Sequence, residues 1–206
     1  MHPAAVILQA TKLSFGYGTE SLLFDELSLS LPPGVCFIGG DESTGKTTLL
    51  RLLAGDLAAH GELRINDVSL AQDRAAYRRQ VAWIDPQSTA LDSQTAHQIF
   101  ATTLPACNPD MLDAHIDGLA LAPHLDKTLT MMSTGTRRKV LIAATLAAEA
   151  PVTLLDQPFK ALDRPSIDYL LAVLAQARRP PARAWVVADY EPPPGIDLTR
   201  LIELGV

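Results

Sequence analysis

The sequence lacks the features that would tie it to a membrane span, a disulfide framework or a nucleic acid. It has two cysteines in 206 residues, Cys36 and Cys107, and neither belongs to a CxxC pair. Its longest nearly apolar run, residues 140–148, is far shorter than the roughly 20 residues that cross a bilayer. The formal net charge is −6 and basic residues are scattered, so we expect no nucleic acid partner. The low cysteine count favours a reducing compartment, and apolar residues at 48% indicate one globular chain.

Short runs of Val, Ile and Leu alternate with helical patterns, which is typical of parallel strands covered on both faces. These runs are residues 35–38, 81–84, 152–155, 185–187 and 201–204. They predict an α/β, doubly wound core. Two further segments, 22–31 and 61–68, alternate apolar and polar residues, which predicts an antiparallel side sheet. Residues 88–132 carry helical but no strand patterns, so we expect a helical insertion there.

A phosphate-binding loop follows the first buried run. Residues 40–47 match G-x-x-x-x-G-K-[ST] in full, and an apolar-periodic helix follows. Backbone N–H groups of such a loop cradle phosphates, Lys46 reaches the β- and γ-phosphates, and the Thr47 hydroxyl takes a Mg²⁺ position. A chance glycine-rich turn is the alternative, and the strand before and helix after disfavour it. The nucleotide-binding candidates are Gly40, Asp41, Glu42, Ser43, Thr44, Gly45, Lys46, Thr47 and Thr48.

A carboxylate ends the apolar run 152–155. Asp156 alone would be read as a turn former, but beside a phosphate loop it becomes a candidate Mg²⁺ ligand through water.

The order of the remaining motifs resembles the ATP-binding cassette (ABC) family along nearly the whole chain. Tyr17 stands where the family stacks an aromatic ring on adenine, and Gln87 where a glutamine contacts the metal and senses the membrane partner. Residues 132–136 resemble the LSGGQ signature, and residues 161–163 the D-loop. The signature residues Ser133, Thr134, Gly135 and Thr136 are thereby implied to face ATP held by a second cassette.

The resemblance implies one ABC-type domain over residues 1–206, with a P-loop NTPase (RecA-like) core, an N-terminal antiparallel β subdomain and the helical insertion. It also implies ATP and Mg²⁺ as ligands, with Thr47, Gln87 and Asp156 at the metal. The expected partners are a second cassette, identical or related, and integral membrane subunits of a transporter. The chain is then expected to be cytoplasmic and peripheral on the membrane. Its short form most resembles small cassettes of haem-exporter type.

Three cations follow the signature in the first turn of a predicted helix: Arg137, Arg138 and Lys139. Cations there oppose the helix dipole and favour a nearby anion. We expect them either to favour the ATP of a second cassette or to form a solvated basic face.

Several positions depart from the family pattern. Gln157 replaces the glutamate that activates water, and although it cannot act as a general base, it can orient water. Asp189 occupies the place of the switch histidine, where it is either catalytic or a strand-end turn residue. Asp41, Glu42 and Ser43 add two carboxylates and remove a glycine from the phosphate loop, which predicts weakened ATP binding unless the carboxylates point outward. Thr134 replaces a signature glycine.

Two functions follow from these observations. The first is an ABC transporter ATPase subunit that couples ATP binding, and slow hydrolysis, to transport, with Gln157, Asp189 and Gln87 as catalytic candidates. The second is a nucleotide-binding regulatory or structural module with little or no turnover, paired with an intact cassette. Cassettes of translation or DNA repair are disfavoured, because the sequence has neither tandem cassettes nor coiled coils.

Overall fold

Two β-sheets form the framework of the chain. The computed structural model describes residues 6–18, 21–103, 109–177 and 183–205. One sheet is antiparallel with the order β2-β1-β4-β5, and the other is parallel with the order β6-β7-β8-β3-β9. The antiparallel strands are β1 (Leu8–Phe15), β2 (Phe24–Leu31), β4 (His60–Ile65) and β5 (Val68–Ser69). The parallel strands are β3 (Gly34–Gly39), β6 (Val81–Ala82), β7 (Val152–Asp156), β8 (Ala184–Ala188) and β9 (Leu198–Glu203).

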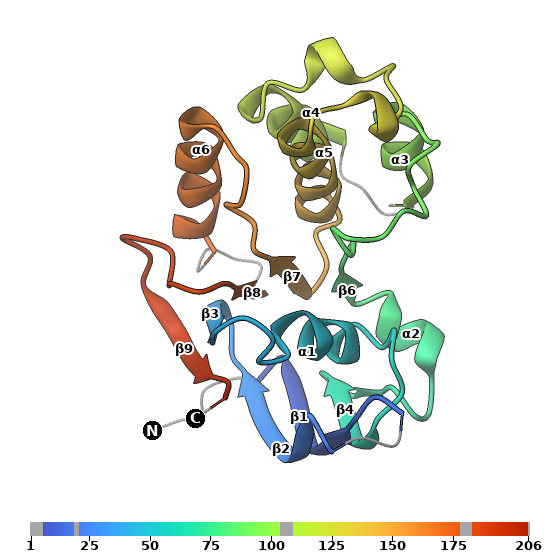
Figure 1. Cartoon of the computed structure of the whole chain (residues 1–206), viewed down its shortest axis with the longest axis vertical. Coiled ribbons are helices and arrows are strands. Elements are labelled where there is room, and N and C mark those ends of the chain that lie inside the picture. The colour runs from blue at the N-terminus through green and yellow to red at the C-terminus, as the bar shows by residue number, and fades with distance from the viewer. Residues whose placement is uncertain (1–5, 19–20, 104–108, 178–182, 206) are drawn as a thin grey trace.

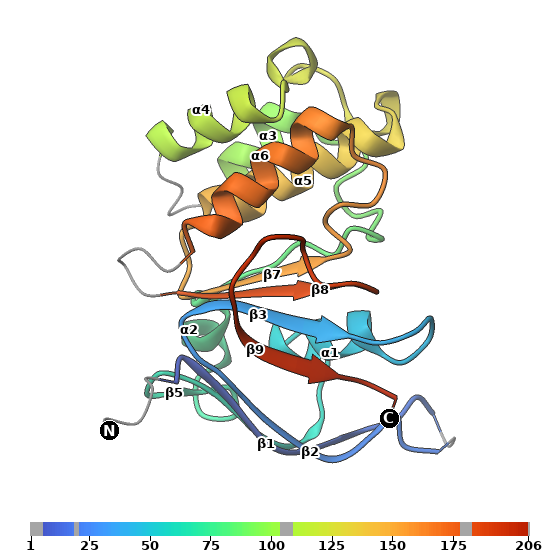
Figure 2. The same cartoon turned by 90° about the vertical axis from the view of Figure 1, so that its left-hand side faces the viewer.

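Helices cover both faces of the parallel sheet. On one face lie α3 (Ala96–Thr103), α4 (Pro109–Gly118), α5 (Thr134–Ala147) and α6 (Arg164–Ala175). The 3₁₀ turns η1 (Ala122–His124) and η2 (Leu129–Met131) link α4 to α5. On the other face, α1 (Lys46–Leu53) and α2 (Arg74–Arg78) accompany the antiparallel sheet (Figures 1 and 2).

The alternation of side chains along β3 explains why two cores form. Cys36 and Ile38 pack into a core with α1 and the antiparallel sheet, whereas Val35 and Phe37 pack into a second core with α5 and α6. Every residue of β3 is buried, as expected for a central parallel strand. The parallel sheet therefore holds its strand ends rigidly between two apolar layers.

The predicted α/β core with an antiparallel side sheet is confirmed, with differences at the sheet edges. The sequence prediction missed β1, because a left-handed Lys12 (φ 51°) and two register shifts break its alternation. The prediction that both faces of every parallel strand are covered was wrong for β9, which lies at the sheet edge and leaves Leu201 54% exposed. β6 ends at Ala82, two residues earlier than predicted.

The segment 88–132 lies between β6 and α5 in the sequence. Its described residues form α3, α4, η1 and η2 and no named strand, apart from an isolated bridge between Thr95 and Thr128. Cys107 lies outside the described residues. Within the described part of the chain, no helix is both long and apolar enough to span a bilayer.

Candidate functional site

The phosphate loop leaves the carboxyl end of β3 and enters α1. Gly40 and Gly45 have φ of 151° and 95°, and a Cβ on Gly45 would lie 2.9 Å from a ring carbon of Phe24. Glycine is therefore required at these turns. Ser43 also has a positive φ, 65°, a backbone conformation that glycine adopts with less strain than serine. The curl of the loop brings successive backbone groups to the start of α1.

Lys46 lies inside this curl. Its side chain is buried, and Nζ donates hydrogen bonds to the carbonyls of Gly40 (2.5 Å) and Asp41 (2.7 Å). The ammonium also lies 4.4 Å from the ring centroid of Tyr190, a cation–π distance. Asp41 and Glu42 are exposed, and Asp41 turns its carbonyl toward Lys46. The positive charge of Lys46 thus lies at the centre of the loop, whereas Asp41 and Glu42, which carry its two carboxylates, are exposed to solvent.

The predicted metal ligands Thr47 and Asp156 meet at the ends of α1 and β7. The Thr47 hydroxyl donates to Oδ2 of Asp156 at 2.6 Å, whereas the buried Oδ1 of Asp156 accepts no hydrogen bond from the described residues. Burial raises the pKa of Asp156, against the lowering effects of the Thr47 bond and of Arg138, and Asp85 and Asp189 raise it further.

A buried carboxylate that lies beside a hydroxyl and has one oxygen without a hydrogen-bond partner fits a hard cation such as Mg²⁺. The described residues contain no cluster of three acidic, histidine or cysteine ligands. Since Mg²⁺ is often held by one or two carboxylates plus phosphate oxygens, two protein oxygens here suffice for a metal that arrives with a nucleotide.

A cleft of about 390 Å³ opens beside the phosphate loop. Its lining includes Tyr17, Glu42, Ser43, Gly45, Lys46, Thr47, Thr48, Gln87, Gln157, Lys160 and Tyr190. Tyr17 is half exposed at the rim, its hydroxyl lies 3.1 Å from that of Thr48, and Phe15 packs edge-on against its ring. A half-exposed aromatic ring therefore lies at the rim of the cleft.

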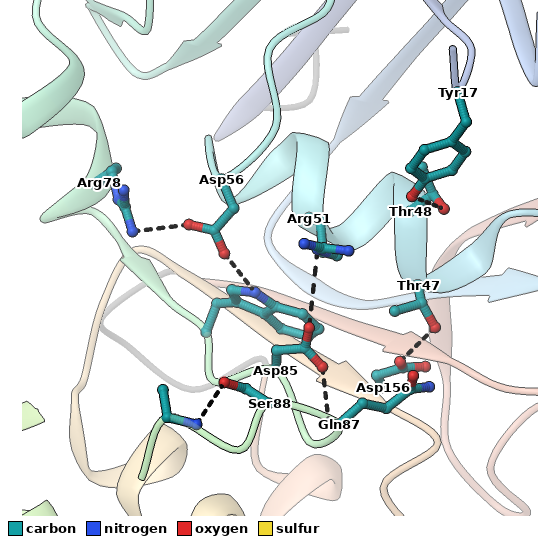
Figure 3. A network of polar contacts seen from close by, with 12 residues as sticks. Tyr17, Thr47, Thr48, Arg51, Asp56, Arg78, Asp85, Gln87, Ser88 and Asp156 are labelled. Carbon is teal, nitrogen blue, oxygen red and sulfur yellow. Dashed lines mark hydrogen bonds and ion pairs between the residues drawn. The ribbon is translucent and has the colours of Figure 1, made fainter.

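Gln87 enters the cleft from the loop after β6. Its N–H donates to Asp85 at 2.9 Å, and Asp85 lies 3.8 Å from Arg51 of α1 in an ion pair. Figure 3 shows the Gln87 side chain extending toward Asp156. This ion pair connects the loop that carries Gln87 to α1, the helix that follows the phosphate loop.

Gln157 and Asp189 lie at the carboxyl ends of β7 and β8. The Gln157 N–H donates to the Ala188 carbonyl at 2.8 Å, and Lys160 Nζ lies 3.3 Å from its side-chain oxygen. Burial raises the pKa of Asp189, and the Tyr190 N–H, followed by the charge of Lys46, acts against this rise. The parallel sheet thus places Gln157 in the lining of the cleft and Asp189 next to Tyr190, which also lines it.

The signature begins α5 as predicted from its N-cap serine. Ser133 Oγ accepts the Thr136 N–H at 3.1 Å, and the Thr136 hydroxyl lies 2.9 Å from that of Ser133. A Cβ on Gly135 would lie 2.5 Å from the Ala161 carbonyl, so only glycine fits against the D-loop. Thr134 is exposed at the helix start.

The three cations after the signature contact their own chain, which the alternative of a solvated basic face did not anticipate. Arg137 pairs with Asp92, and Lys139 pairs with Asp163 at 2.6 Å. Arg138 donates to backbone carbonyls at the end of β7. These three positions therefore do not form a solvated basic face, because each cation is bound within the chain. That the helix start favours the ATP of a second cassette stays a prediction.

Sequence reasoning missed two residues beside the site, Tyr190 and Lys160, and it missed the contact of Arg138 with Gln157. Tyr190 follows Asp189 and Lys160 lies three residues after Gln157, but no spacing rule predicts the contacts of Tyr190 with Lys46 or of Arg138 with Gln157.

The model of the ABC transporter family matches residues 24–160, more than half of the chain. The chain belongs to the ABC transporter family. The cytochrome c biogenesis ATP-binding export protein CcmA of Pseudomonas syringae is 33% identical over 183 residues, 85% of each chain. The CcmA protein of Aromatoleum aromaticum is 34% identical over 165 residues, 76% of each chain.

Solved structures of ABC proteins share the fold of this cassette. An ATP-binding subunit of an ABC transporter superposes with a TM-score of 0.79 at 22% identity, covering 89% of this chain and 79% of that one. A putative ABC transporter ATP-binding protein from Pyrococcus furiosus gives 0.74 at 20% identity, covering 96% of both. The chain is an ATP-binding subunit of an ABC transporter, similar to CcmA export proteins.

Proposed function

We propose that this cassette binds Mg²⁺–ATP in the cleft beside Lys46, pairs with a second cassette, and turns ATP over slowly. The observation that carries the proposal is the pairing of Thr47 with the buried, half-satisfied carboxylate of Asp156 beside a curled phosphate loop. The loop supplies positive charge and N–H donors, and this pair supplies oxygens for a metal.

Each residue of the cleft has a role in this proposal. Lys46 exchanges the carbonyls of Gly40 and Asp41 for oxygens of the β- and γ-phosphates. Thr47 and Asp156 hold Mg²⁺, directly or through water, and the ion neutralises phosphate charge when bound. Tyr17 offers its half-exposed ring to adenine.

Gln157 is the reason for the proposed slow turnover. Its side chain can hold a water by hydrogen bonds, but it cannot accept the proton that the water loses, which costs about 10²- to 10⁴-fold in rate. Asp189 lies near the cations Lys46, Arg138 and Lys160, which offset its charge near the phosphates. These features also favour the second candidate, a nucleotide-binding module with negligible turnover that pairs with an intact relative.

ATP turnover by the purified chain, by Gln157→Glu and by Lys46→Ala distinguishes these functions. We expect slow wild-type turnover, a rise of at least tenfold in Gln157→Glu, and none in Lys46→Ala. The exposed Gln72→Glu adds the same charge as a control and leaves the rate unchanged. ATP binding without wild-type turnover supports the module. Equal rates in wild type and Gln157→Glu refute the role of Gln157.

We further propose that the cassette is peripheral on the cytoplasmic face and docks on integral membrane subunits through the Gln87 loop and the helical insertion. The CcmA relatives are named as ATP-binding export proteins of cytochrome c biogenesis, which suggests the same process here. Co-purification from detergent-solubilised membranes should recover a protein with several apolar spans. Recovery of soluble partners alone would contradict this proposal.

A further inference from the structure

The first turn of α5 connects the signature to three separate segments of the chain. Arg137 pairs with Asp92 and donates to the Ser88 carbonyl at 2.5 Å, in the segment after Gln87. Lys139 pairs with Asp163 at the end of the D-loop. Charged hydrogen bonds therefore join the start of α5 directly to both segments.

Arg138 makes the third connection, to the catalytic end of β7. One guanidinium nitrogen, Nη1, donates to the carbonyls of Asp156 at 3.1 Å and of Gln157 at 2.6 Å. The arginine thus links the helix of the signature to the two residues that the proposed function places at the metal and at the attacking water.

Gln157 is a residue whose backbone needs such support. It has a φ of 44°, a region that residues other than glycine populate sparsely and keep only when neighbours fix it. Its N–H is fixed by the Ala188 carbonyl at 2.8 Å, and its carbonyl accepts from Arg138 and from the Lys160 N–H at 3.1 Å. Of these partners, Arg138 alone comes from the helix that starts at the signature.

We propose that Arg138 is a positioning residue that couples the signature helix to Gln157, so that engagement of the signature by a second cassette adjusts the water-binding end of β7. The inference rests on the proposed function, in which the signature contacts ATP held by that cassette. It adds a residue that touches neither ATP nor metal.

Hydrogen exchange with and without Mg²⁺–ATP tests this role independently of turnover. In the wild type, ATP should protect both the phosphate loop, residues 40–48, and the end of β7, residues 155–160. Arg138→Met keeps the side-chain stem but removes its donors, so it should retain the first protection and lose at least half of the second. Arg138→Lys, which keeps one donor group and the charge, should recover part of it. The exposed Arg164→Met is the matched control and should behave as wild type.

A double-mutant cycle adds a readout that a structural role would not move. In the Gln157→Glu protein, Ser133→Ala and Arg138→Met should each lower turnover at least tenfold, and their combination should be no worse than about the larger single effect. If the double variant instead loses turnover by the product of the two single fold losses, the proposed coupling is refuted.

The remaining outcomes separate this proposal from the proposed function. Unchanged protection of residues 155–160 in both Arg138 variants, with ATP still protecting the phosphate loop, overturns the role of Arg138 alone. Loss of phosphate-loop protection in Arg138→Lys means that the residue serves ATP binding itself, which also overturns it. Absence of ATP protection in the wild type refutes the proposed function and the coupling with it.

Discussion

His115 of α4 should make the stability of this cassette fall in mild acid. Its side chain is 2% exposed, and burial, against the weaker opposing charge of Glu149, lowers its pKa to about 4. The Tyr169 hydroxyl donates to the Ala114 carbonyl (3.0 Å) and therefore accepts from Nδ1–H of His115 (2.8 Å). Nε2 is buried with no hydrogen-bond partner among the described residues. The folded state thus holds His115 neutral.

The sign and size of the effect follow from linkage. Below its ordinary pKa of 6.5, His115 takes up a proton in the unfolded state but not in the folded state, so stability falls as the pH drops from 6.5 toward 4. With those two pKa values, this one group removes about 2 kcal/mol of unfolding free energy between pH 7 and pH 5.

Urea denaturation of wild type and His115→Phe at pH 7, 6 and 5 measures this contribution. Phenylalanine keeps the ring volume and leaves the Tyr169–Ala114 bond in place, so the variant should gain about 2 kcal/mol on the wild type between pH 7 and pH 5. The exposed His97→Gln is the control and should retain the wild-type acid loss. A constant difference between His115→Phe and wild type across this range would refute the burial argument.

Three other substitutions test the cleft and the signature. Tyr17→Ala should weaken ATP binding by about fivefold, the equivalent of about 1 kcal/mol for a lost aromatic stack, while tripolyphosphate binds as before in a calorimetric titration. Asp156→Asn should abolish the Mg²⁺ dependence of ATP binding without lowering the melting temperature in EDTA, because it replaces a buried carboxylate that has an idle oxygen; a retained Mg²⁺ dependence would exclude Asp156 as a ligand. Gly135→Ala should cost about 1 to 3 kcal/mol in denaturation, because its Cβ would lie 2.5 Å from the Ala161 carbonyl. Thr134→Ala, one exposed position earlier, should cost little, and equal losses would contradict the close contact.

Much of the fold was predictable from local patterns, and the failures have physical causes. The buried runs at 35–38 and 152–155 became the central strands β3 and β7, because continuous apolar runs suit a sheet covered on both faces. The strand β1 was missed, since its bulges and left-handed Lys12 disrupt the period of two. β9 looked like a core strand, but its sequence does not specify that it takes the sheet edge.

The candidate site, like the fold, was predicted only in part. Lys46 and Thr47 were predictable because one contiguous loop carries their chemistry, and Asp156 because it ends a buried strand. The intrachain partners of the cations after the signature were not predicted, since helix-dipole reasoning considers one helix and the carbonyls that bind Arg138 come from another element. The contact of Tyr190 with Lys46 was likewise invisible.

The sequence by itself determined the class of the chain: a phosphate loop, a strand-end carboxylate and a signature in the order of an ABC cassette. Those features are contiguous or ordered along the chain, so they can be read without coordinates. The tertiary structure decided which groups meet: Thr47 with Asp156, Arg138 with Gln157, and His115 with Tyr169. Each pair joins residues 19 to 109 positions apart, because the packing of helices on a parallel sheet, rather than any local pattern, sets those distances.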